Sequence, residues 1–239
     1  MRKMLLFILS ILLLGLGACQ GTIAGSDQLV TQARIVSGVN AVRLMTSGDL
    51  TIEQGTQESL TIQADVKIIS LLTSDVSGGT LELSVQSLSG FTTSLPIKYT
   101  LVVKDINALT LMGSGDITAG ALNGDTVTIT SMGSGDTKIA QLIAKTMNVA
   151  IDGSGDVNVS AGNADNAKVQ VNGSGNFTAG NLQIGKATFS ILGSGSSETW
   201  VTNELSVNIL GSGDVRYYGK PALQQSIFGS GNVISLGNK

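Results

Sequence analysis

The sequence predicts an all-β fold: a single-stranded parallel β-solenoid, similar to a right-handed β-helix, whose coils of about 20 residues turn at Gly-Ser-Gly. The first observation behind this prediction is a motif, Gly-Ser-Gly followed usually by Asp or Asn, that recurs from residue 113 to the C-terminus. Its copies are separated by four intervals of 20 residues and then two of 18. A fixed period of this length indicates a stacked repeat in which each coil contacts its neighbours along one axis.

The second observation is a period-2 alternation of apolar residues around each motif. The positions six, four and two residues before the first glycine are mostly branched and apolar, as in Met147, Val149 and Ile151. A shorter alternation follows the motif, as in Val157 and Val159. This pattern predicts two short strands per repeat, each with one buried face. Stacking would pair equivalent strands about 4.8 Å apart and fill a thin core with these apolar columns.

The motif itself is predicted to form the corner between strands. Glycine permits a positive φ or a close backbone approach, and the intervening serine can satisfy backbone groups that the bend leaves unpaired. The predicted corner glycines are Gly113, Gly115, Gly133, Gly135, Gly153, Gly155, Gly173, Gly175, Gly193, Gly195, Gly211, Gly213, Gly229 and Gly231.

The residue after each corner is usually acidic or an amide. This column consists of Asp116, Asp136, Asp156, Asn176, Ser196, Asp214 and Asn232. We favour a structural interpretation, in which each side chain bonds its own turn as an Asx arrangement. A second interpretation is a calcium ladder between coils, because Ca²⁺ prefers oxygen ligands. Its ligands would be Asp116, Asp136, Asp156 and Asp214.

The N-terminus resembles the signal peptide of a bacterial lipoprotein over residues 1–18. A basic dipeptide precedes an apolar run over residues 4–14, which is of secretory length and too short to span a membrane. Residues 16–19, Leu-Gly-Ala-Cys, resemble the lipobox, which implies cleavage before Cys19 and its acylation; several acyl chains give stable membrane anchoring. The alternative is an ordinary signal peptide with a cysteine at its cleavage site. Gln20 resembles the residue found there in lipoproteins sent to the outer membrane.

One domain is predicted after the signal peptide. Residues 19–33 are small and polar and should form the lipidated N-terminus and a flexible tether. The solenoid is predicted over residues 34–239, with regular repeats over 106–236. A disguised first coil carries Thr-Ser-Gly-Asp at residues 46–49. The period is lost over residues 66–105, which should form longer coils or a hairpin that covers one end of the solenoid.

Two further expectations concern the ends of the repeat array. Leu60 and Ile62 follow the disguised corner at the same offsets as Val127 and Ile129 follow Gly113, which predicts that they belong to the first coil. At the other end, no amphipathic helix closes the last coil. An open terminal coil favours either self-association into a homo-oligomer or a short, protected last strand.

The composition excludes several classes of chemistry. The chain has no histidine and one cysteine, so His-based triads, cysteine nucleophiles and ordinary zinc sites are not expected. Removing Arg2 and Lys3 with the signal peptide leaves 12 basic and 17 acidic residues, a net charge of −5, which gives no basis for binding nucleic acid. No dinucleotide or P-loop fingerprint is present, and no cofactor is expected.

One enzymatic alternative remains, a carboxylate-dependent polysaccharide enzyme, because glycoside hydrolysis needs only two carboxyl groups. Trp200, Tyr217 and Tyr218 could line one exposed sugar-binding patch. We favour a different arrangement, in which Tyr217 fills a core column and Trp200 covers a corner. A polar ladder repeated in every coil also favours a structural role, since an active site needs one distinct place.

The chain resembles the head GIN domain family, whose members are described as autotransporter adhesins. The resemblance rests on the lipoprotein-type leader, the alternating strand at residues 97–103 and the successive Gly-Ser-Gly-Asp coils, and it spans about residues 35–236. The tripeptide Gly-Ile-Asn does not occur. The resemblance implies an exported β-solenoid with an adhesive role.

These observations together predict a non-enzymatic, lipid-anchored protein of the bacterial cell envelope, at the outer membrane, with no catalytic residues. It should contact protein or glycan ligands. The alternatives are the polysaccharide enzyme and a structural or stress-response envelope scaffold.

Overall fold

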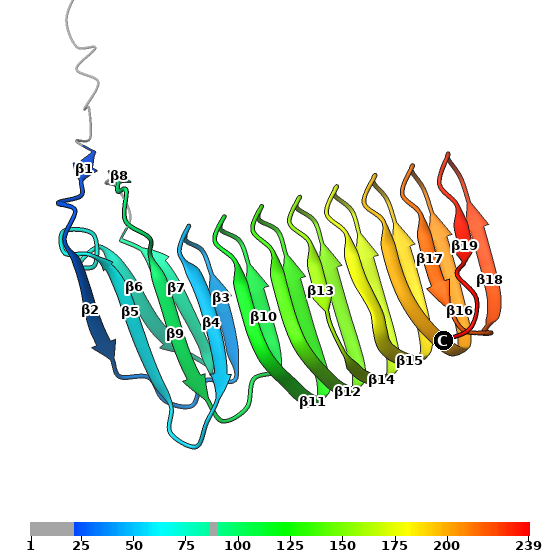
Figure 1. Ribbon diagram of the computed structural model, residues 1–239, viewed down its shortest axis with the longest axis horizontal. Helices are drawn as coiled ribbons and strands as arrows, with labels where there is room; N and C mark the ends of the chain where they lie inside the picture. The colour runs from blue at the N-terminus through cyan, green and yellow to red at the C-terminus, as the bar shows by residue number, and fades with distance from the viewer. Residues whose placement is uncertain (1–21, 87–89) are drawn as a thin grey trace, which may run out of the picture.

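A computed structural model of the chain describes residues 22–86 and 90–239 (Figure 1). These residues form an elongated stack of strands, and the predicted parallel β-solenoid is confirmed. Within the described residues no helix is long and apolar enough to cross a membrane. The predicted signal peptide and Cys19 lie outside the described residues.

The chain contains an irregular N-terminal part and a regular repeat part. The strands of the first part are β1 (Ile23–Ala24), β2 (Leu29–Arg34), β3 (Ala41–Leu44), β4 (Asp49–Gln54), β5 (Ser59–Asp65), β6 (Leu72–Ser77), β7 (Thr80–Val85), β8 (Phe91–Thr92) and β9 (Lys98–Val103). Those of the second are β10 (Ala108–Leu111), β11 (Ile117–Ser131), β12 (Thr137–Ile151), β13 (Val157–Val159), β14 (Gly162–Val171), β15 (Phe177–Ile191), β16 (Ser197–Ile209), β17 (Val215–Tyr218), β18 (Ala222–Ile227) and β19 (Val233–Ser235).

Two facing layers of paired strands enclose the core. Sheet A runs in the order β2-β5-β9-β4-β11-β12-β13-β15-β16-β17-β19. Sheet B runs in the order β6-β7-β3-β10-β11-β12-β14-β15-β16-β18. The long strands β11, β12, β15 and β16 contribute to both sheets because each one bends midway. From β3 and β4 to the C-terminal end, neighbouring strands are parallel and pair equivalent residues of successive coils, apart from a shift between β15 and β16. Equivalent positions therefore form ladders along the solenoid.

The core consists of the apolar columns that the sequence alternation predicts. Their Val, Ile, Leu, Met and Phe side chains are buried from both sheets. The two layers meet across the core, as at Phe177 of sheet A and Phe189 of sheet B, whose ring centroids are 6.1 Å apart. Burying a side chain of this size contributes about 1.5–3 kcal/mol, so the repeated columns supply the main stabilisation of the fold.

The first coil lies inside the stack rather than at its end. Its strands β3 and β4 pair on one side with β10 and β11 and on the other with β7 and β9. The chain therefore completes this coil, builds the N-terminal end, and returns to add the regular coils on the opposite side (Figure 1). The prediction that a coil precedes the obvious repeats is confirmed. The assignment of Leu60 and Ile62 to that coil is wrong, because they lie in β5, which runs antiparallel between β2 and β9.

Antiparallel strands cover the N-terminal end of the solenoid. In the irregular segment β6 and β7 form an antiparallel hairpin, and β7 and β9 lie parallel to β3 and β4 as a longer coil, so both structures considered for this segment occur. The structure differs from the expected tether: β2 is a paired strand of the folded domain. Its last residue, Arg34, donates hydrogen bonds to the carbonyl oxygens of Ile69 and Leu72.

The change of period from 20 to 18 residues is absorbed at one bend. The register between β15 and β16 shifts between Ala179 and Gln183 and again between Ile184 and Lys186. On either side of these shifts the pairs remain in line, as at Phe189 and Val207. The corners therefore continue to stack although the coil is shorter.

Candidate functional site

The corner glycines stack so closely that no other residue fits. A Cβ atom added to any glycine of the seven motifs would lie only 1.8–2.2 Å from the carbonyl oxygen of the residue beneath it in the preceding coil. Of these glycines only Gly229 has a positive φ, so close backbone approach, rather than conformational freedom, is what requires glycine. The serines between them are exposed, and they bond the coil below through backbone amides, as from Ser134 N to Gly113 O at 3.2 Å.

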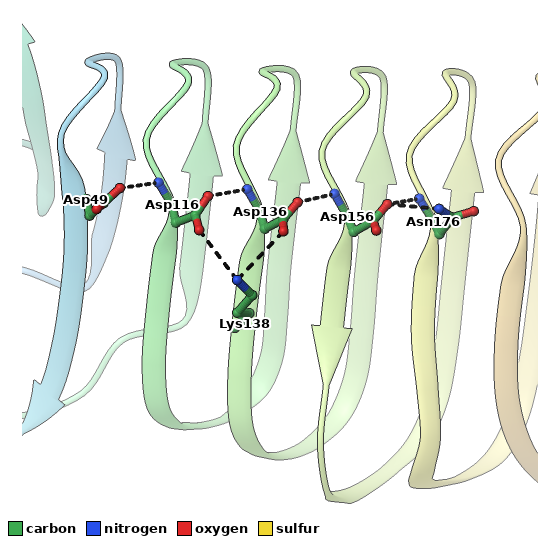
Figure 2. Close-up of polar contacts among 6 residues, drawn as sticks. All are labelled: Asp49, Asp116, Asp136, Lys138, Asp156 and Asn176. Atoms are coloured by element: carbon green, nitrogen blue, oxygen red, sulfur yellow. Dashed lines mark hydrogen bonds and ion pairs between the residues drawn. The ribbon is translucent and has the colours of Figure 1, made fainter.

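The acidic column after the corner forms a ladder of hydrogen bonds between coils (Figure 2). Oδ1 of Asp116 accepts the backbone amide of Asp136 at 2.8 Å, and Oδ1 of Asp136 accepts that of Asp156 at 3.0 Å. The ladder begins at Asp49 of the first coil and continues through Asn176. Each side chain thus bonds the next coil and not its own turn, which corrects the expected Asx arrangement.

A lysine occupies the space beside two of the proposed calcium ligands. Lys138 Nζ lies 3.4 Å from Asp116 Oδ2 and 3.7 Å from Asp136 Oδ2. The described residues contain no group of three or more acidic, histidine or cysteine side chains placed to hold a metal ion. The ladder carboxylates already have partners, an amide and in part an ammonium group, and this arrangement explains their recurrence without a cation.

A buried carboxylate lies at the other end of the molecule. Asp65 accepts hydrogen bonds from the backbone amides of Ser26 and Lys67, at 2.7 and 2.8 Å, and from the Ser26 hydroxyl. Burial acts to raise the pKa of Asp65, but these hydrogen bonds outweigh it and hold the pKa below its ordinary value. The carboxylate fastens the first described residues to the N-terminal end, which is a structural role.

The outer face of sheet B carries two shallow hollows. The larger has a volume of about 460 Å³, and its lining includes Lys186 and Glu204, which form an ion pair at 2.7 Å. The smaller, of about 170 Å³, is lined by side chains that include Thr130, Asn148 and Gln170. Glu204 is the one carboxylate that lines either hollow. Neither hollow therefore holds the pair of carboxyl groups that glycoside hydrolysis needs.

The aromatic residues divide between the core and the surface. Tyr217 packs against the core cluster, as we expected. Trp200 and Tyr218 are cross-strand neighbours of β16 and β17 in sheet A and are half-buried. The ammonium group of Lys239 lies 4.6 Å from the Tyr218 ring centroid and 5.9 Å from that of Trp200, and it bonds Asn181 Oδ1. The C-terminal residue thus covers the aromatic pair.

The structure therefore defines a repeat protein of the parallel β-solenoid class with polar outer faces, closed by antiparallel strands at its N-terminal end. Within that class, the family described as "Putative auto-transporter adhesin, head GIN domain" matches residues 39–221. The chain belongs to this family.

Solved structures share the solenoid fold of this chain. A putative adhesin from Bacteroides fragilis NCTC 9343 matches with a TM-score of 0.85 and 28% identity, over 90% of this chain and 100% of that one. A protein from Parabacteroides distasonis ATCC 8503 described as a putative lipid binding protein matches with a TM-score of 0.70 and 26% identity, over 90% and 99%. A putative adhesin from Parabacteroides merdae ATCC 43184, at 21% identity and a TM-score of 0.69, shares the fold over 90% and 99%. No relative is found among the curated proteins.

Proposed function

We propose that this chain is a lipid-anchored cell-envelope protein that presents its solenoid as a rigid, non-enzymatic surface for adhesion to protein or glycan ligands. The observation that carries this proposal is the outer face of sheet B. Its rows of outward side chains are mostly hydroxyls and amides, as at Thr128, Thr130 and Gln170, on a backbone fixed by stacked corners. Such a face offers repeated hydrogen-bonding groups at one spacing, which suits an extended ligand. Membership of an adhesin family supports the same function.

The ligand-binding part of the proposal is tested on arrays of glycans and extracellular proteins. We expect the purified chain to bind a ligand there and to lose that binding in the double variant Asn148→Arg/Gln170→Arg, which fills the smaller hollow with bulk and charge. The matched control is Asn158→Arg/Thr178→Arg, which makes the same kind of change on sheet A. Loss of binding in the control alone would overturn the assignment to sheet B. Glycan turnover that Glu204→Gln abolishes would overturn the non-enzymatic role.

The anchor is tested separately by metabolic labelling with a fatty acid. The residues that support it are the apolar run and the Leu-Gly-Ala-Cys sequence at 16–19. We expect label in the wild-type chain and none in Cys19→Ala, with that variant released from the membrane fraction. Label that persists in Cys19→Ala would refute acylation at this residue.

Exposure at the cell surface distinguishes an adhesin from an internal envelope scaffold. We propose that the protein is held at the outer membrane with its solenoid outside the cell. Protease added to intact cells should then degrade the chain, while a periplasmic marker stays intact. Protection of the chain until the outer membrane is opened would favour the scaffold.

A further inference from the structure

Most coils expose an apolar side chain directly before the corner. In the eight coils this position is occupied by Met45, Met112, Met132, Asp152, Asn172, Leu192, Leu210 and Phe228. Its six apolar members are 39–70% exposed, although the residue one position earlier is buried in most of these coils, as at Leu111 and Ile191. We call these six apolar residues the corner row, which follows the edge of the solenoid where the glycines stack.

The corner row consists of two stretches in which neighbouring coils each contribute one residue. The backbone amides of Met112 and Met132 donate hydrogen bonds to the preceding coil at 2.8 Å, and that of Leu210 does so at 2.7 Å. Residues of the row in adjacent coils are therefore about 4.8 Å apart. Between the two stretches, the Asn172 amide bonds the Asp152 carboxylate at 2.6 Å. Single exposed apolar residues are common, but contiguous apolar surface is typical of an interaction site.

The charges around the corner row limit what can contact it. Apart from Asp152, the positions from the row to the second corner residue glycine carry no charged residue in any coil. The ladder carboxylates follow directly on sheet A, and Lys138 pairs with two of them, Asp116 and Asp136 (Figure 2). The remaining ladder acids would repel an anionic surface. The edge therefore favours an apolar partner whose polar groups carry no net charge.

The proposed lipid anchor lies on the same side of the molecule as the corner row. Strand β1 pairs with β8, and the chain passes from β8 into β9, whose first residue, Lys98, is the register partner of Asp49 beside the first corner. Figure 1 shows β1 and β8 on the side of the corners and away from the bends. The three residue steps from Cys19 to Thr22 span at most about 11 Å. Acyl chains on Cys19 would therefore bring lipid close to the corner edge.

We propose that the corner row is a membrane-contacting surface, so that the anchored solenoid lies along a bilayer with its corner edge against headgroups of no net charge. This inference rests on the proposed acylation of Cys19. The acyl chains supply the binding, and the row sets the orientation of the rod. In this orientation the solenoid axis runs parallel to the membrane, and the outer face of sheet B stays open to ligands. A protein could cover the same row, but the anchor on the same side favours lipid.

The first test asks which edge of the solenoid contacts lipid. A chain that begins at Cys19 is coupled through this thiol to a maleimide lipid in phosphatidylcholine vesicles, which supplies an anchor whether or not cells acylate the residue. The variant Trp200→Phe/Leu210→Trp carries one tryptophan in the corner row. Its matched control is Trp200→Phe/Ile143→Trp, because Ile143 is 42% exposed at the bend of β12, on the opposite edge.

Bromine atoms on the lipid acyl chains quench tryptophan that lies close to them. We expect brominated lipid to cause a loss of fluorescence from the reporter at position 210 and none from the reporter at position 143. Adding Met132→Asp/Leu192→Asp to the first variant should restore its fluorescence, because charged residues would replace two members of the row. Absence of quenching at position 210, or equal quenching at both positions, would overturn the proposal and leave the row to a protein partner.

The second test measures the orientation of the rod and needs no substitution. Hydrogen bonds between coils run along the solenoid axis, so the backbone carbonyl groups point along it. Polarised infrared spectra of the coupled wild-type chain on a supported bilayer should therefore place the amide I dipole in the membrane plane. A dipole along the membrane normal would mean that the rod stands upright, which would overturn the proposal. Failed acylation would instead appear as missing fatty-acid label in cells while both measurements succeed, so the two failures are distinguishable.

Discussion

The regular coils and the N-terminal end use the same alternating strands but hold them together in different ways. Between successive regular coils the same two contacts recur. Each corner glycine packs against the carbonyl oxygen of the residue beneath it, and the Asp carboxylate after the corner accepts a hydrogen bond from the backbone amide of the next coil. At the N-terminal end, single side chains make contacts that occur once, such as Asp65 with Ser26 and Arg34 with Ile69. A repeat is thus specified by a column of residues, whereas its closure is specified residue by residue.

The largest effect is expected from adding a methyl group to a corner. In Gly155→Ala the new Cβ would lie 1.8 Å from the carbonyl oxygen of Gly135, so the two coils must separate. We expect a loss of unfolding free energy on the order of 4 kcal/mol. Urea denaturation followed by circular dichroism measures it. The control is Gly120→Ala, whose Cβ would meet its nearest atom at 3.9 Å and should change stability by less than about 0.5 kcal/mol. Equal effects at both sites would contradict the close-contact explanation.

A smaller, pH-dependent effect is expected at the N-terminal end. Because the pKa of Asp65 is lower in the folded chain, its carboxylate stabilises the fold above the unfolded-state pKa, and this contribution disappears as the pH falls through the folded-state pKa. Asp65→Asn should therefore lower the denaturation midpoint at pH 7, and its difference from the wild type should shrink as the pH falls below the ordinary pKa of Asp and through the lowered folded-state pKa. Asp75→Asn, an exposed change at the same end, is the control. A difference that is independent of pH would contradict the role of the charge.

Substitutions of Asp156 should show whether the ladder depends on the hydrogen-bond acceptor or on the negative charge of the carboxylate. Oδ1 of Asp156 accepts the amide of Asn176 at 2.8 Å, and Asn176 performs the same role for the next coil. We expect Asp156→Ala to cost about 1 kcal/mol because the amide loses its acceptor, and Asp156→Asn to cost almost nothing. Thermal melts of the two variants compare them. If Asn were as harmful as Ala, the ladder would depend on charge and not on the hydrogen bond.

The smallest effect should be a gain in stability. Thr137 is buried in a core column, and within the described structure its hydroxyl has no hydrogen-bond partner. Thr137→Val keeps the shape and removes the unpaired hydroxyl, so it should stabilise the fold by about 0.5–1 kcal/mol. The exposed Thr118→Val in the neighbouring coil should leave stability unchanged. Destabilisation by Thr137→Val, measured by denaturant titration, would indicate that this hydroxyl does have a partner.

The strands and pairing of the repeat part could be predicted well because the same residue pattern recurs there in every coil. The alternation before each motif predicts the inward side chains, and the constant spacing predicts that equivalent residues pair, as Val149 does with Val169. The early coil at residues 46–49 was also predictable, since one glycine and the acid are retained. The physical reason is that, in a parallel stack of equal coils, each residue pairs with the residue at the equivalent position of the next coil.

The N-terminal end could not be predicted in the same way. Leu60 and Ile62 have the offsets of coil residues, but alternation reports which face is buried and not the direction of the partner strand, so their place in antiparallel β5 was missed. Strand β2 was missed because its polar residues resemble a tether, although backbone pairing with β5 holds it. The hydrogen-bond partners predicted for the acidic column were also wrong. An Asx turn and a hydrogen bond to the next coil need the same residue types, so the sequence does not separate them.

The detour of the chain around its first coil leaves the coils from β11 to β14 stacked directly on one another. Gly133 stacks on Gly113, and Gly153 stacks on Gly133, through the same contact. Excising residues 133–152 would therefore seat Gly153 on Gly113 and preserve both termini of the rod. Each such excision or duplication changes the reach of the molecule by about 4.8 Å. Evolution can in this way adjust the length of the rod without redesigning either of its ends.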